Sequence, residues 1–302
     1  MAACVQNRAF IAVADQLNNL APPPARAGCT ISGKTLMPLD LKAADAAAQI
    51  LFEARRDGIG LEPLPEGIRP VTASDGYAVQ AGLVARLLAA NGVRRAGYKI
   101  GATNPTARAM LGTNEAFGGV LISSTCYRAP LTIKAEDYRI LIIEPEIGLR
   151  LGKGLPLSGA PYTPERVAEA VDAAVPSIEV VTSPFTVWNE AGIGCIIGDN
   201  GNHACWLHGE FVTDFRQLDL ADLPVSLSVN GNVERTGSGR NVDGGPMTVL
   251  AWLANFLISM GQELKAGDLV TTGSATQPFF GSAGQELVAD FGALGQCRLT
   301  IE

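Results

Sequence analysis

The pattern of apolar and polar positions predicts a helical segment followed by a β-rich remainder. Residues 40–57 are rich in alanine and form a helix pattern that stops at Gly58. Thr72 is placed to cap a second helix, and residues 74–91 carry apolar side chains at helical spacing up to Gly92. We therefore expect two consecutive helices in this region.

After Gly97 the pattern changes to short apolar runs separated by glycine, proline and asparagine, which is typical of strands. Residues 230–231, Asn-Gly, predict a hairpin turn. Helices are expected to open at Thr163-Pro164 and to run over residues 246–260. The runs that predict strands are 98–100, 119–122, 140–151, 178–181, 193–197, 225–229, 268–272, 286–291 and 296–301. Together these elements predict an α+β fold.

The same pattern divides the chain into three parts. Residues 1–36 form an N-terminal extension, in which an amphipathic stretch over 8–20 runs into three prolines. Residues 37–96 form a helical N-terminal region, and residues 97–302 a β-rich domain that we expect to hold the catalytic site.

Composition narrows the possible partners and location. The formal charge of −7 and the lack of a basic stripe argue against nucleic-acid binding. No run approaches the roughly 18 apolar residues that a membrane span requires, and no basic segment leads into a signal-like apolar run. The six cysteines are scattered without C-x-x-C spacing, which favours reduced thiols in a cytoplasmic protein.

Three acids stand in otherwise apolar strand patterns. Glu144 and Glu146 end one run, and Glu179 lies inside the next. Strand side chains alternate faces, so neighbouring strands would bring the three carboxylates together. Carboxylates about 4 Å apart repel by roughly 4 kcal/mol at an effective dielectric near 20, and a hard cation such as Mg²⁺ or Mn²⁺ removes that repulsion. An E-x-E pair is also common on solvated strand faces, but a carboxylate flanked by Ile and Val, as Glu179 is, is rarely buried without a partner.

Other candidate groups are individually weaker. Lys99, in a short strand between two glycines, is either an exposed strand lysine or an acid–base group with a lowered pKa. Residues 271–274, Thr-Thr-Gly-Ser, end a strand in a loop that suits carboxylate binding. Neither His203 nor His208 has a cysteine at zinc-finger spacing, so ordinary structural roles are expected for both.

A series of short motifs carries a family resemblance over residues from about 40 to the C-terminus. The motifs are Asp-Gly-Tyr-Ala-Val-Gln (75–80), Gly-Tyr-Lys-Ile-Gly (97–101), Phe-Gly-Gly-Val-Leu (117–121), Glu-Pro-Glu-Ile (144–147), Ile-Glu-Val-Val (178–181), Gly-Asp-Asn (198–200) and Thr-Thr-Gly (271–273). This series resembles the fumarylacetoacetate hydrolase superfamily, most closely its 2-hydroxypenta-2,4-dienoate (2-keto-4-pentenoate) hydratase branch. The neighbouring branch contains the 4-oxalocrotonate decarboxylases.

The resemblance implies a mixed β-roll or barrel of the fumarylacetoacetate hydrolase type, preceded by helices and assembled as a homodimer or larger homo-oligomer. It implies a divalent metal, Mg²⁺ or Mn²⁺, on the three acids. The site residues that it implies are Glu144, Glu146 and Glu179 for the metal, Lys99 for catalysis, and Thr272, Gly273 and Ser124 for the substrate. Ser124 stands where hydratases often have an aspartate, and residues 201–204, Gly-Asn-His-Ala, replace a small Ala-Ser type sequence.

The implied activity is that of a metal-dependent lyase that adds water to a 2-hydroxy-2,4-dienoate or 2-oxo acid through an enolate. A 4-oxalocrotonate-type decarboxylase and a C–C bond hydrolase are alternatives, because the same enolate supports both reactions. A non-catalytic subunit that binds metal or small acids is a third possibility, and a complex with a related decarboxylase or hydratase is compatible with each.

Overall fold

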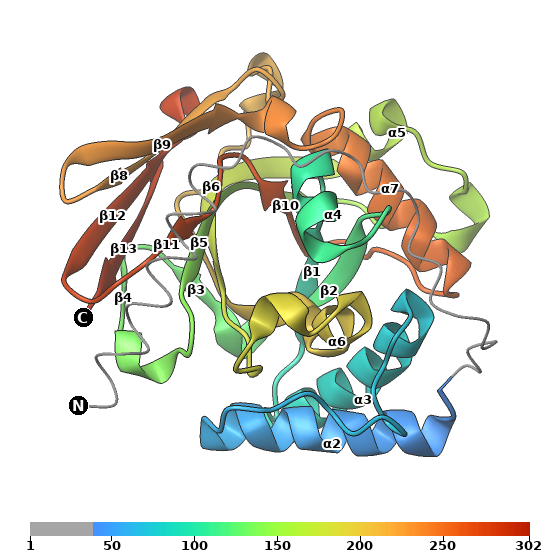
Figure 1. Cartoon of the computed structure of the whole chain (residues 1–302). Helices are drawn as coiled ribbons and strands as arrows, with labels where there is room; N and C mark the ends of the chain where they lie inside the picture. The colour runs from blue at the N-terminus through green and yellow to red at the C-terminus, as the bar shows by residue number, and fades with distance from the viewer. Residues whose placement is uncertain (1–38) are drawn as a thin grey trace. The chain divides into compact units, whose positions relative to one another are not determined.

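A large curled sheet and a smaller sheet form the centre of the structure (Figure 1). The computed structural model describes residues 39–302. Strands of the large sheet run in the order β2 (Phe117–Ile122), β1 (Arg95–Gly101), β10 (Leu269–Ser274), β5 (Ile142–Leu151), β6 (Val171–Val181), β7 (His203–His208) and β3 (Cys126–Arg128), and β11 (Phe279–Phe280) also pairs with β5. The small sheet has the order β4 (Leu131–Ile133), β13 (Gln296–Ile301), β12 (Gln285–Asp290), β8 (Pro224–Val229) and β9 (Asn232–Ser238).

Helices pack around the curled sheet. They are α2 (Leu41–Asp57), α3 (Ala73–Asn91), α4 (Pro105–Leu111), α5 (Pro164–Ala168), α6 (Ile193–Gly198) and α7 (Pro246–Ser259). Figure 1 looks along the curl, with α2 and α3 below it and α5 and α7 on the right. Among residues 39–302, no helix combines the length and the apolar character needed to cross a bilayer.

The two N-terminal helices form where the sequence predicts them. The side chain of Asp40 accepts a hydrogen bond from the backbone of α2, and Gly58 ends that helix. Thr72 and Asp75 form a reciprocal capping box at the start of α3. Apolar side chains of the two helices, including Leu51 and its α3 neighbours, bury one another in a separate small core. The local signals are sufficient here because caps and helical periodicity act within a few residues.

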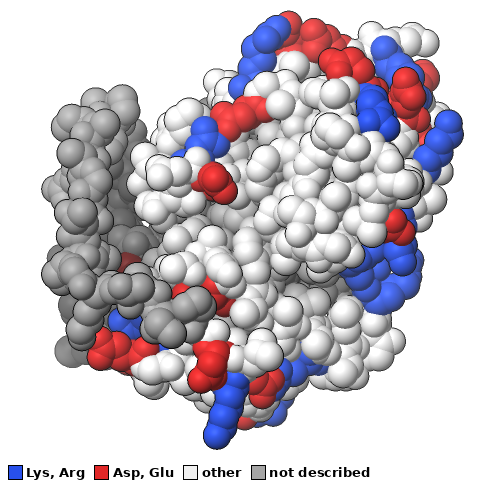
Figure 2. Space-filling model, turned by 90° about the vertical axis from the view of Figure 1, so that its right-hand side faces the viewer, with Lys and Arg blue, Asp and Glu red and all other residues white. Residues whose placement is uncertain are grey.

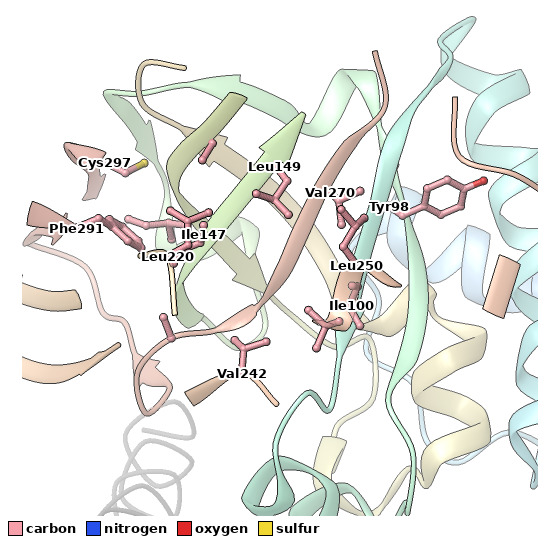
Figure 3. Close-up of a cluster of buried hydrophobic side chains, with 14 of the residues drawn as sticks. Tyr98, Ile100, Ile147, Leu149, Leu220, Val242, Leu250, Val270, Phe291 and Cys297 are labelled. Atoms are coloured by element: carbon pink, nitrogen blue, oxygen red, sulfur yellow. The ribbon is translucent and has the colours of Figure 1, made fainter. Parts of the chain in front are cut away.

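The main core lies on the outer face of the curled sheet. Odd-numbered residues of β5, such as Ile147 and Leu149, pack there with Tyr98, Val270 and Leu250 of α7 (Figure 3). Even-numbered residues of β5 point to the inside of the curl, because strand side chains alternate. Strand β5 is therefore buried on both faces over most of its length, although its inner face carries Glu144 and Glu146.

One predicted strand is wrong. Residues 193–197 lie in the helix α6, which is buried from Gly194 to its end and packs against α3. A Cβ at Gly194 would lie 2.4 Å from the carbonyl oxygen of Pro70, and one at Gly76 would lie 2.6 Å from the carbonyl oxygen of Gly194. A short apolar run fits a buried strand and a buried helix equally well, so periodicity alone did not separate them.

Other boundaries differ in length rather than type. Strand β6 begins at Val171, well before the predicted run at 178, and continues through Pro176. The helix predicted at Thr163-Pro164 is the short α5. The hairpin predicted at residues 230–231 joins β8 to β9, with positive φ angles at Asn230 and Gly231. Helix α4 and the strands β3, β4, β7, β9 and β11 were not predicted.

Residues Pro38–Glu302 form one unit, so α2 and α3 belong to the same body as the sheets. The predicted extension, residues 1–36, lies outside the described residues, as does the amphipathic stretch within it. Four of the six cysteines are described, and they are free thiols, three of them buried: Cys126, Cys195, Cys205 and Cys297. The face that carries α5 and α7 has a broad central area without charged side chains, with charges gathered toward its edges (Figure 2).

Candidate active site

Three carboxylates meet on the inner face of the curled sheet. Glu144 and Glu146 come from β5 and Glu179 from β6, where Glu144 lies directly opposite Glu179 in the antiparallel register. One oxygen of each carboxylate lies within 4.8 Å of the others. Glu146 and Glu179 are buried, and Glu144 is half-buried. Alternation along two paired strands therefore brings together the acids that the sequence singled out.

Glu146 is held by the end of β10. Its Oε2 accepts hydrogen bonds from the hydroxyl of Thr271 and, at 2.9 Å, from the backbone N–H of Gly273. Gly273 has φ +104°, and a Cβ there would lie 1.9 Å from Oγ1 of Thr103. The positive φ and the close packing against Thr103 therefore require glycine at the residue that donates to Glu146.

The predicted Thr272-Gly273 pair is only partly directed at the site. Gly273 contacts Glu146, whereas the hydroxyl of Thr272 donates to the backbone oxygen of Ile147 at 2.8 Å. Thr271, one residue earlier, faces Lys99 across the parallel pair of β1 and β10. Nothing in the sequence distinguishes Thr271 from its neighbours, because the sequence does not show which side of β10 faces the curl.

Glu179 has two donors on one oxygen. Oε1 lies 2.8 Å from Nδ1 of His203 and 3.2 Å from Nζ of Lys99. Oε2 is buried and has no hydrogen-bond partner among residues 39–302. His203 thus lies at the site, although only an ordinary structural role was expected for it. The sequence carried one signal for it, the departure from the usual small residues at 201–204.

Lys99 is enclosed on every side. It is 3% exposed, and its Nζ donates to the backbone oxygen of Gly201 at 3.0 Å. Its Nζ also lies 5.6 Å from the ring centroid of Phe117. A Cβ at Gly119 would lie 2.8 Å from Cγ of Lys99, and one at Gly201 would lie 3.2 Å from its Cδ. The exposed-lysine alternative is therefore wrong, and the side chain is fixed in one position.

Burial and the neighbouring charges together set the pKa values of the site's acids. Burial raises the pKa of Glu144 to about 7, repulsion from Glu179 adds to this, and Lys99 opposes it. Burial and both neighbouring acids raise the pKa of Glu146 well above its ordinary value. Burial also acts to raise the pKa of Glu179, but Lys99 and His203 outweigh it, and the net shift is downward.

The same balance acts on Lys99. Burial by itself would lower the pKa of its ammonium, but Glu179, Glu144 and Glu146 outweigh burial and raise it. The lowered pKa expected from the sequence therefore depends on a cation that neutralises these carboxylates.

The residues present fit a divalent cation. Among the described residues, the candidate ligands are carboxylate oxygens, one of which, Oε2 of Glu179, is buried and has no hydrogen bond there. A buried ionised oxygen without a partner is unfavourable unless a cation contacts it. Oxygen ligands suit hard ions such as Mg²⁺ and Mn²⁺.

Ser124 lies apart from this group of contacts. It is exposed, in the short turn Ser123–Thr125 that follows β2. Its neighbour Thr125 places Oγ1 3.3 Å from Nε2 of His203. Thr125 is thus the residue of this turn that joins the hydrogen-bonded groups, and a substrate-binding role for Ser124 stays a prediction.

Comparison with known proteins finds one matching family and similar hydratases. The family described as "Fumarylacetoacetate (FAA) hydrolase C-terminal" matches residues 104–302. The 2-hydroxyhexa-2,4-dienoate hydratase of Comamonas testosteroni is 31% identical over 257 residues, which cover 84% of this chain and 96% of that protein. The 2-keto-4-pentenoate hydratase of Paraburkholderia xenovorans (strain LB400) is 29% identical over 258 residues, 85% and 94% of the two chains.

A solved structure shows the same fold. The 4-oxalocrotonate decarboxylase from Pseudomonas putida G7, complexed with magnesium and adipate, superposes with a TM-score of 0.78 at 23% identity. The match covers 89% of this chain and 100% of that one. At this identity the likeness concerns the fold.

We predict that Glu146→Gln weakens Mn²⁺ binding without unfolding the protein. The amide removes one negative ligand but keeps the size of the side chain. The Kd for Mn²⁺, measured by calorimetry, should rise at least about tenfold. Mutation of a residue that only hydrogen-bonds a metal ligand already lowers metal affinity, typically by about 10–100-fold. Glu234→Gln, at an exposed position of β9, is the matched control. An unchanged Kd in Glu146→Gln would remove Glu146 from the metal site.

We also predict that Mn²⁺ affinity falls as the pH drops through about 7. Glu144, with a pKa of about 7, must release its proton to bind a cation. The pKa of Glu146 is also raised, so this carboxyl must release a proton as well. Between pH 8 and pH 6 the Kd should therefore increase by about tenfold or more. Titrations in buffers of different ionisation enthalpy should show proton release near pH 6. Equal Kd values at pH 6 and pH 8 would contradict the assignment.

Proposed function

Because the chain belongs to the fumarylacetoacetate hydrolase family, we propose that it is a divalent-metal-dependent lyase that adds water to a short 2-hydroxy-2,4-dienoate. The observation that carries the proposal is the buried amino group of Lys99 beside three carboxylates that fit a metal. The two hydratase relatives, matched over nearly their whole length, support the type of reaction.

A cation on Glu144, Glu146 and Glu179 would supply Lewis-acid stabilisation of the negative charge on the oxygens of a 2-oxo acid. The chain's own part begins with Lys99. Its Nζ takes the proton of the C2 hydroxyl and returns a proton to the far end of the diene, which yields an α,β-unsaturated ketone. Water then adds across the remaining double bond, with its oxygen on the β carbon and a proton on the α carbon.

The position of Lys99 suits this proton transfer. The backbone oxygen of Gly201 and the carboxylate of Glu179 both hold Nζ, so little conformational entropy remains to be lost during reaction. The ring of Phe117 and the backbones at Gly119 and Gly201 keep water from the stem of the side chain. A fixed and desolvated amine is a more effective acid–base group than a mobile one in water.

The surroundings of the acids favour a substrate with one carboxylate. Ile142 and Val181, two residues beyond Glu144 and Glu179, lie opposite each other and point to the same face as the acids. They belong to an apolar cluster whose other members are Leu111, Ile140, Trp188 and Phe280. A second carboxylate, as in 4-oxalocrotonate, would need a cationic partner in place of this cluster.

Arg108 of α4 lies near the C-terminal end of β1, and its guanidinium already has polar partners. Arg108 of α4 donates to the backbone oxygen of Ala102 at 3.1 Å and is paired with Asp243. The apolar cluster and this paired arginine favour the hydratase over the decarboxylase. The choice of Mg²⁺ or Mn²⁺, a homo-oligomeric state, a complex with a related enzyme and a cytoplasmic location stay predictions.

The reaction itself is tested by two substrates. With Mg²⁺ or Mn²⁺, 2-hydroxypenta-2,4-dienoate should lose its ultraviolet absorbance without release of CO2, as the diene is converted to the ketone and then hydrated. Incubation with 4-oxalocrotonate under the same conditions should release CO2 at no more than about a hundredth of that rate, because a desolvated, unpaired carboxylate costs about 3 kcal/mol or more. Rapid CO2 release would establish the decarboxylase instead.

We predict that Lys99→Met retains metal binding and loses turnover. Methionine fills the enclosed space but cannot carry a proton. The rate should fall about 10²–10⁴-fold, the usual contribution of a positioned acid–base group. Lys134→Met, at an exposed position, is the control. If folded, Mn²⁺-binding Lys99→Met kept more than about a tenth of the parent rate, Lys99 would not be the catalytic group.

A further inference from the structure

The two carboxylate oxygens of Glu179 differ in their hydrogen-bond partners. Oε1 lies 2.8 Å from Nδ1 of His203 and 3.2 Å from Nζ of Lys99, whereas Oε2 is buried and has no hydrogen bond within the described part of the chain. The terminal torsion of a glutamate is broad and roughly two-fold, so the carboxylate can exchange its oxygens unless something holds it. Two donors on the same oxygen remove that freedom.

A turn with three successive positive φ angles places His203 beside Glu179. Between α6 and β7, Asn200, Gly201 and Asn202 have φ angles of +56°, +66° and +57°. Asn200 and Asn202 adopt the left-handed conformation although they carry side chains, and such residues keep it only where the surrounding structure fixes them. The turn also presents the Gly201 oxygen that holds Lys99. One strained segment therefore positions both donors of Glu179.

The segment 199–203 is fixed by contacts at both of its ends. Arg55 of α2 binds both carboxylate oxygens of Asp199 at 2.6 and 2.8 Å, and donates to the backbone oxygens of Asp199 and His203 at 2.9 Å each. The side chain of Asn200 bonds to both the N–H and the C=O of Val120 in β2, at 2.7 and 2.9 Å. These bonds hold the turn against α2 on one side and β2 on the other.

The histidine ring is fixed as well as its backbone. It is 3% exposed, and its Nε2 lies 3.3 Å from Oγ1 of Thr125. Its Nδ1 contacts the oxygen of Glu179 that also lies near Lys99, and not the oxygen that has no partner among residues 39–302. The arrangement resembles the support that carboxylate ligands of metals commonly receive from neighbouring donors.

We propose that His203 is a positioning residue that commits Oε1 of Glu179 to hydrogen bonding and so presents Oε2 to the divalent cation. The inference rests on the proposed metal-dependent function. It assigns to His203 a role in metal affinity that depends on an N–H donor at the place of Nδ1. It predicts no contact between His203 and the substrate.

The test compares substitutions that differ in the donor. His203→Asn keeps an amide N–H near the position of Nδ1, His203→Gln places its amide near the position of Nε2, and His203→Leu has no donor. Calorimetry with Mn²⁺ should give a Kd within about threefold of the parent for His203→Asn. The Kd should rise about 10–100-fold for His203→Gln and His203→Leu.

His208→Leu is the matched control, since His208 lies on the same strand and its Nδ1 lies 2.8 Å from the backbone oxygen of Gly209. Its Kd should equal that of the parent. The turnover of His203→Gln, relative to that of the parent, should be higher at saturating Mn²⁺ than at limiting Mn²⁺. The reason is that the defect lies in metal affinity.

Two results would overturn the inference. Parent-like Mn²⁺ affinity in both His203→Gln and His203→Leu would show that the donor is unnecessary. Equal weakening in His203→Asn and His203→Gln would show that the ring matters only for packing, and this comparison holds even if His203→Leu does not fold. A parent protein without Mn²⁺ binding would instead contradict the proposed function, so the two failures are distinguishable.

Discussion

The crowding of three carboxylates on one face of a buried sheet is the constraint on which the rest of the site depends. Pairs of charges about 4 Å apart repel by roughly 4 kcal/mol even at an effective dielectric near 20, and burial removes the water that would soften this. The protein offsets the repulsion with donors aimed at individual oxygens: Thr271 and Gly273 at Glu146, and Lys99 and His203 at Glu179. What remains is an excess of negative charge that a divalent cation matches.

The scaffold makes this crowding possible because its central strands are buried on both faces. The outer face of β5 contributes Ile147 and Leu149 to the main core, and this packing fixes the strand. The inner face then holds its carboxylates rigidly with respect to β6. The burial of apolar side chains on the outer face therefore offsets the cost of burying carboxylates on the inner face.

The N-terminal helices act at a distance on the same site. Tyr77 accepts a hydrogen bond from the N–H of Gly118, and Gln80 donates to the carbonyl oxygen of the same residue. Both come from α3, and they hold β2 beside Lys99. Arg55 of α2 holds the turn that carries His203. The helices thus position two of the groups that contact Glu179, although neither helix supplies a candidate ligand.

The sequence by itself determined the features that depend on neighbours in the chain. Caps and periodicity located α2 and α3, the Asn-Gly pair located the β8–β9 hairpin, and strand alternation placed Glu144 and Glu146 on one face. These signals act within a few residues, where hydrogen bonding and side-chain direction follow from the local backbone.

Only the tertiary structure decided the features that depend on register and packing between distant segments. A five-residue apolar run became α6 because it is buried against α3, and Thr271 rather than Thr272 reached Glu146 because of the side that β10 turns to the curl. His203 lies beside Glu179 through a turn held by Arg55, which is distant in the sequence. Local propensity carries no information on such contacts, because their free energy is set by groups that meet only when the chain has folded.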